Sequence, residues 1–103
     1  MTAKEWLFKT YNSRDEFFVR PRALCQDGFS ISIQASSFVY CTPRKLLLNG
    51  NYITVELGYA SAHEELLEGY KDGTIYPYVP MTVVEEVIKK HGGIVGGSAR
   101  WED

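Results

Sequence analysis

The chain has 103 residues, of which 45% are hydrophobic and 23% are charged, and its formal net charge is −2. These values predict one globular domain with a buried core and exclude a wholly disordered chain. No apolar run approaches the length of a membrane-spanning helix, and the N-terminal segment lacks the pattern of a secretory signal. We therefore expect a cytoplasmic protein, a setting in which the two cysteines remain reduced.

The charge is unevenly distributed along the chain. Residues 1–50 contain seven Lys or Arg against four Asp or Glu, whereas residues 51–103 contain four against nine. This pattern excludes a uniformly basic nucleic-acid binder and a densely acidic DNA mimic. It leaves two interpretations open, namely two solvated faces of one domain or a polarised surface that steers a partner.

In the first half, the capping-box spacing of Thr2 and Glu5 predicts a short helix over about residues 3–12. The stretch "FFVRPRALCQDGFSISIQAS" predicts a β-hairpin that turns at Gln-Asp-Gly, with alternating Ile and Ser residues on its second strand. Pro21 lacks an N–H, so the first strand is expected at a sheet edge or bent there. The stretch "FVYCTP" predicts a third short strand.

In the second half, an Asn-Gly turn precedes a strand in "YITVELGY". Ser61 and Glu64 have the spacing of a second capping box, which predicts a short central helix with Leu66, Leu67 and Tyr70 facing inward. The stretch "TIYPYV" predicts a last strand or extended segment. Pro80 then begins a C-terminal helix, whose apolar positions recur at helical spacing and which Gly92 closes.

These elements predict an α+β fold. We expect a small antiparallel sheet of four or five strands packed against an N-terminal helix, a short central helix and a C-terminal helix. The C-terminal helix is expected to bury Val84, Val87 and Ile88. Residues 1–94 form the predicted single domain, and the glycine-rich residues 95–103 are predicted to be a flexible tail.

The sequence predicts no catalytic residue, no bound cofactor and no metal site. His91 lies in the last turn of its helix, where a positive charge complements the helix dipole, and we interpret it as structural. His63 is interpreted as a surface residue. Cys25, Cys41 and the two histidines are residue types that bind zinc, but their positions lack the short paired spacing of a zinc site. An enzyme, the least favoured class, would need one of these cysteines folded against one of these histidines.

A basic and aromatic cluster suggests a binding surface. Two arginines of the first strand precede Arg44 and Lys45, and aromatic residues accompany them; the members are Arg20, Arg22, Arg44, Lys45, Phe17, Phe18, Phe38 and Tyr40. Such a surface can stack bases and hold phosphates. The alternative interpretation is a partly exposed sheet edge whose aromatic rings belong to the core.

Three stretches, "DGFSISIQASSFVYCTPR", "YITVELGYASAHEELLEGY" and "YPYVPMTVVEEVIKKHGGI", resemble a family of small uncharacterised proteins from phages, prophages and mobile elements of gut bacteria. The resemblance covers most of residues 24–94 and contains no catalytic motif. It implies an accessory protein of a mobile element that acts in the cytoplasm of a bacterial host. Small acidic single-domain proteins of this kind are common among phage inhibitors of host defence, including anti-CRISPR proteins.

The sequence and this resemblance together predict a non-enzymatic inhibitor that binds a host defence protein, such as a CRISPR effector. Neither a membrane nor free nucleic acid is expected as a partner. The alternative function is a single-stranded nucleic-acid-binding accessory protein that uses the basic and aromatic sheet edge. The residues predicted to bind the partner are Arg20, Arg22, Tyr40, Arg44, Lys45, Glu64, Glu65 and Glu68.

Overall fold

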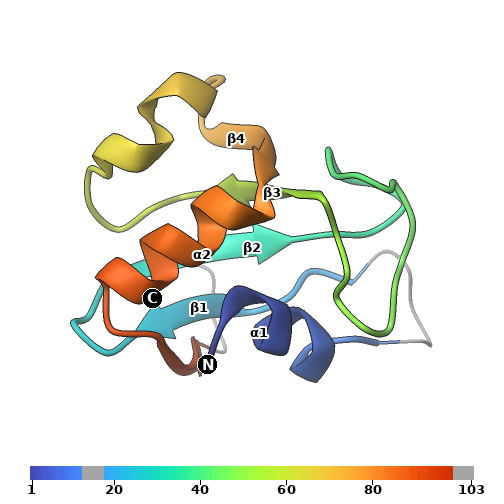
Figure 1. Ribbon diagram of the computed structural model, residues 1–103, viewed down its shortest axis with the longest axis horizontal. Coiled ribbons are helices and arrows are strands. Elements are labelled where there is room, and N and C mark those ends of the chain that lie inside the picture. Colours follow the sequence, from blue (N-terminus) through green and yellow to red (C-terminus); the bar gives the residue numbers. More distant parts are fainter. Residues whose placement is uncertain (13–17, 99–103) are drawn as a thin grey trace.

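The computed structural model of the chain describes residues 1–12 and 18–98. These residues form a five-stranded antiparallel sheet with the strand order β4-β3-β2-β1-β5, and two α-helices cover one of its faces (Figure 1). The strands are β1 (Arg22–Cys25), β2 (Ser30–Gln34), β3 (Thr54–Gly58), β4 (Ile75–Pro80) and β5 (Ile94–Ser98). The helices are α1 (Ala3–Lys9), α2 (Met81–Lys90) and the 3₁₀-helix η1 (Glu65–Tyr70). The predicted α+β fold is confirmed.

Helix α1 begins at the predicted capping box. The hydroxyl of Thr2 accepts a hydrogen bond from the Glu5 N–H at 3.1 Å, and the Glu5 carboxylate accepts one from the Thr2 N–H at 2.8 Å. The helix ends at Lys9, earlier than predicted, and Thr10 is its C-cap. Its buried residues include Trp6 and Leu7, which belong to the main hydrophobic core.

The predicted hairpin is present as β1 and β2. Its turn is closed by the Cys25 N–H, which donates to the Phe29 carbonyl at 2.8 Å, and by the Asp27 carboxylate, which accepts from the Phe29 N–H. The edge position predicted for the first strand is wrong, because β5 pairs with the other side of β1. Pro21 directly precedes β1, so its missing N–H removes no bond from the strand ladder.

Helix α2 matches its prediction closely. Val84, Val87 and Ile88 are buried in the main hydrophobic core, as predicted. Pro80 is the N-cap residue, and His91 is the C-cap residue. Gly92 follows with a φ of +89°, the left-handed conformation that closes a helix and that glycine adopts without steric cost.

Three local predictions are wrong, namely a third strand at residues 38–43, the Ser61 cap and the inward position of Leu66. Residues 38–43 form no strand; they run as bends and turns, and their one β-bridge to β3 is the isolated pair Thr42 and Thr54. The predicted short central helix is present as the 3₁₀-helix η1, but the predicted cap is wrong, since the Ser61 hydroxyl accepts from the Ser30 N–H instead. Of its predicted inward residues, Leu67 is fully buried and Leu66 is exposed.

The flexible tail predicted over residues 95–103 is also wrong in its first part, since residues 95–98 belong to β5. The physical reason lies in α1: a Cβ atom on Gly97 would overlap with the indole ring of Trp6, so glycine lets this strand lie directly on the helix. Residues 99–103 lie outside the described part of the chain. No helix in the described ranges is long and apolar enough to cross a membrane.

Candidate functional site

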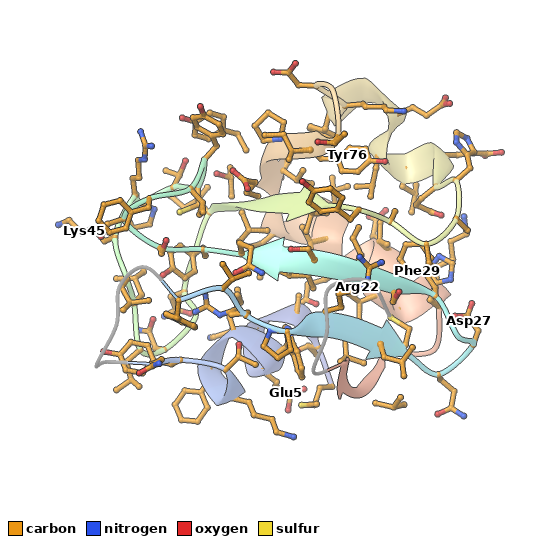
Figure 2. All side chains as sticks on the ribbon, turned by 180° about the vertical axis from the view of Figure 1, so that it is seen from behind. Glu5, Arg22, Asp27, Phe29, Lys45 and Tyr76 are labelled. Atoms are coloured by element: carbon orange, nitrogen blue, oxygen red, sulfur yellow. The ribbon has the colours of Figure 1, made fainter. Side chains whose placement is uncertain are left out.

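Both faces of the central strand β2 are buried, although only one of them faces the helices. Ile31 and Ile33 belong to the helix-covered core, as the alternation predicts. Ser32 and Gln34 point to the opposite face and are buried as well. Figure 2 shows that face, with the strands in front of both α-helices. We call it the outer face.

A groove of about 570 Å³ lies on the outer face. Its floor is formed by polar positions of β2 and β3, namely Ser32, Gln34, Glu56 and Gly58. Its walls come from the segment before β1, from the loop after β2 and from the ends of β3 and β4; these residues are Phe18, Val19, Ser36, Phe38, Val39, Tyr59 and Ile75. We refer to this space as the outer-face groove. Its volume lies in the range of small-molecule binding pockets, roughly 300–1,000 Å³.

Hydrogen bonds fix the floor of the groove. The Gln34 amide oxygen accepts from the Arg20 N–H, and its amide nitrogen donates to the Arg20 carbonyl and to the Ser32 hydroxyl, each at 3.0–3.1 Å. Gln34 also lies directly opposite Glu56 in the register of β2 and β3. These bonds fix the orientation of the Gln34 side chain on the floor of the groove.

Glu56 is the acidic residue of the groove. One carboxylate oxygen accepts a hydrogen bond from the Tyr40 N–H at 3.1 Å, and this bond ties the loop after β2 to the sheet. Within the described residues, Glu56 makes no ion pair. No hydrogen bond from this part of the chain reaches its second carboxylate oxygen, which can accept one.

The rim of the groove is apolar and exposed. Val19, Phe38 and Tyr59 expose about half of their surface each. Exposed apolar side chains that surround a hollow are typical of sites that bind another molecule, whereas single exposed ones are ordinary. The outer-face groove therefore combines an apolar rim with a polar, preorganised floor.

Two residues of the predicted binding surface are buried in the fold instead. Arg20 is 1% exposed, and its guanidinium donates to Thr10 Oγ1 and to the Ala35 carbonyl at 2.9 and 2.6 Å. Arg22 is 6% exposed, and it donates to the Ser30 hydroxyl and to the Tyr59 carbonyl. Both arginines hold separate segments together, so they cannot contact the phosphates of a partner. Phe17, which the same prediction included, lies outside the described residues.

The remaining predicted residues divide into two distant groups. Tyr40, Arg44 and Lys45 are exposed, and the Arg44 guanidinium lies 5.4 Å from the centre of the Tyr40 ring. Glu65 and Glu68 are exposed on η1, which lies at the opposite end of the view from Lys45 (Figure 2). The sequence prediction thus joined residues that do not form one surface.

Glu64, the last predicted binding residue, is buried at a polar junction. It is 3% exposed, its carboxylate accepts from Lys90 Nζ at 2.8 and 3.0 Å, and His91 Nε2 lies 3.4 Å away. His91 Nδ1 lies 2.6 Å from the Asp27 carboxylate, and the imidazole stacks on the Phe29 ring. His91 thus caps α2 and also connects it to the β1–β2 turn and to the residue before η1.

The carboxylates of this junction have shifted pKa values. Burial disfavours the charged form of Glu64, but the hydrogen bonds from Lys90 and His91 outweigh it and lower its pKa. The pKa of Asp27 is lowered mainly by the hydrogen bond from the Phe29 N–H and then by that from His91. Both shifts indicate that the junction stabilises the fold.

The two cysteines considered for catalysis or metal binding are buried. Burial raises the pKa of the Cys25 thiol to about 11, and it raises that of Cys41 as well, which opposes formation of the reactive thiolate. The Cys41 thiol contacts the Ser36 and Pro43 carbonyls. Across the described ranges, no group of three or more metal-binding side chains converges.

Comparisons with known proteins give no further guidance, because no family model, curated protein or solved structure matches the chain. The location of the outer-face groove has a partial signal in the sequence, since Thr54, Glu56 and Gly58 alternate with the apolar Val55 and Leu57.

Proposed function

We propose that this chain is a non-enzymatic binding protein that holds a partner protein in the outer-face groove. The observation that carries the proposal is the 570 Å³ groove, with its exposed apolar rim and fixed polar floor, on the sheet face opposite the α-helices. Protein interfaces place their binding energy in a few side chains that fill such pockets.

We further propose that the partner is a component of a bacterial defence complex, such as a CRISPR effector. This part rests on the resemblance of residues 24–94 to small proteins of phages and mobile elements. Inhibition by occupying a surface of the effector would need no catalytic group.

Fewer observations support the alternative function, binding of single-stranded nucleic acid, than support protein binding. Tyr40, Arg44, Lys45 and Tyr78 form an exposed basic and aromatic patch, in which the Tyr40 and Tyr78 ring centres are 5.7 Å apart. Two of the four basic residues that this function required are buried. Fewer phosphate contacts mean weaker and less salt-dependent binding, so we rank the alternative below protein binding.

A variant that fills the groove provides the test. A Cβ atom on Gly58 would lie 3.7 Å from Ile75 Cγ2 and from the Thr74 carbonyl, which is ordinary contact, so the backbone accepts a side chain there. Gly58→Val should fill part of the groove and leave the thermal unfolding temperature near that of the wild type. Phe8→Ala is a matched control, because Phe8 is exposed on α1, on the helix-covered face.

The experiment is capture of partners from a defence-competent bacterial lysate, with the captured component then purified and its binding remeasured. We expect the wild type and Phe8→Ala to bind a defence component and Gly58→Val to lose it. Capture that Gly58→Val leaves unchanged would remove the groove from the proposal. Recovery of no defence component, with no effect of the chain on plating of a targeted phage, would remove the proposed partner class.

A further inference from the structure

The charges around the outer-face groove restrict what it can accept. Two wall residues each contact a buried cation: the Arg20 guanidinium lies 5.0 Å from the centre of the Phe18 ring, and Arg22 donates to the Tyr59 carbonyl. Neither guanidinium lines the groove itself, but each contacts one of its wall residues, so both oppose the attraction that the Glu56 carboxylate exerts on a cationic side chain. An anionic side chain would approach the carboxylate of Glu56 on the floor. The groove therefore favours an uncharged occupant.

The hydrogen-bonding groups of the floor restrict the occupant further. Both polar atoms of the Gln34 side chain are already bonded, and Ser32 accepts one of those bonds. Glu56 offers a carboxylate oxygen, which only accepts hydrogen bonds. The walls contribute the rings of Phe18, Phe38 and Tyr59, which pack best against another flat apolar surface.

We propose that the outer-face groove binds a tryptophan side chain of the partner protein, with the indole N–H donating to the Glu56 carboxylate. Indole is uncharged, large and apolar, and its nitrogen is a donor only, which complements an acceptor-only carboxylate. Tryptophan is also among the residues that dominate protein interfaces. This inference rests on the proposed function, since it specifies what the partner inserts.

The test uses small probes of defined chemistry, titrated into isotope-labelled protein and followed by backbone amide chemical shifts. The probes are the N-acetyl amides of tryptophan, phenylalanine and arginine. We expect the tryptophan probe to shift the amides of Ser32, Gln34 and Gly58 and to bind roughly tenfold or more tightly than the phenylalanine probe, because a hydrogen bond to a charged group contributes about that factor. The arginine probe should bind least.

Glu56→Gln separates the hydrogen bond from the shape of the groove. The glutamine amide oxygen can still accept from the Tyr40 N–H, and its NH₂ group then meets the indole N–H as a second donor. We expect this variant to bind the tryptophan and phenylalanine probes equally. Gly58→Val should weaken both, and Phe38→Ala, a change at an exposed wall position, should do the same if Gly58→Val fails to fold.

Several outcomes would overturn the inference. Equal binding of tryptophan and phenylalanine probes to the wild type would remove the role of Glu56, and tighter binding of arginine would make the groove a cation site. Concentration-dependent dimerisation that Gly58→Val abolishes would make a second copy of this chain the occupant. If Gly58→Val loses the partner protein while Glu56→Gln retains it, the proposed function stands and the tryptophan inference fails.

Discussion

Replacement of Arg20 by alanine should destabilise the fold strongly, although arginine is a residue usually found at the surface. The side chain is 1% exposed, and it connects Ala35, which follows β2, to Leu7 and Thr10 at the C-terminal end of α1. Truncation removes these bonds and leaves the Ala35 carbonyl without its guanidinium donor.

The expected loss of folding free energy follows mainly from the two shorter hydrogen bonds, of 2.9 and 2.6 Å. A hydrogen bond to a charged group contributes about 1.5–3 kcal/mol, and the void adds to the loss. Burial of the charged guanidinium costs free energy and also lowers the pKa of Arg20. Removing that cost offsets part of the stability that the truncation loses. We expect a net loss of roughly 3–5 kcal/mol, or on the order of 15–25 °C in the unfolding temperature of a domain of this size.

The assay is thermal and urea unfolding followed by circular dichroism, with two companion variants. Arg20→Met restores most of the side-chain volume but not the donors, so it should still lose stability. Arg44→Ala, at an exposed position, should stay within about 0.5 kcal/mol of the wild type. An Arg20→Ala protein that unfolds at the wild-type temperature would refute the structural role and return Arg20 to the candidate binding residues.

Three further predictions concern the polar contacts of Asp27 and Glu64 with His91, the two cysteine thiols, and strand β5. Asp27 and Glu64 have folded-state pKa values below their unfolded values, so their stabilisation is present above about pH 4 and is lost as the pH falls through the folded values. Glu64→Gln should therefore flatten the acid side of a stability–pH profile measured by urea unfolding. Cys25 and Cys41 should react with a thiol reagent at pH 8 far more slowly in the native protein than in denaturant; equal rates would contradict their burial. Gly97→Ala should lower the unfolding temperature, because its methyl group overlaps with the indole ring of α1, and an unchanged temperature would contradict that packing.

The parts of the fold that local chemistry determines could be predicted from the sequence. The Thr2–Glu5 capping box and the Pro80 start of α2 involve residues within one or two helical turns. The hairpin turn at Asp27 is equally local. These signals do not depend on which segments later pack together, and the structure confirms them.

The groove could not be predicted in the same way, because its parts come from four separate segments. The Gln34 side chain bonds to the backbone N–H and carbonyl of Arg20, and a contact between residues 14 positions apart leaves no local pattern in the sequence. Glycine and short polar residues in β5 indicated a loose tail, whereas Gly97 is needed for close packing on Trp6. The alternation of Glu56 and Gly58 with apolar neighbours was a usable signal for the groove floor.

Site-specific photo-crosslinking in bacterial cells tests the location of partner binding most directly. A photoreactive phenylalanine analogue replaces either Phe38, at the rim of the outer-face groove and 50% exposed, or Phe8, on α1 and 58% exposed. The two sites present similar side chains with similar exposure on opposite faces of the sheet. We predict a discrete crosslinked protein from position 38 that Gly58→Val abolishes, and none from position 8. A crosslink from position 8 alone would contradict the proposed binding face.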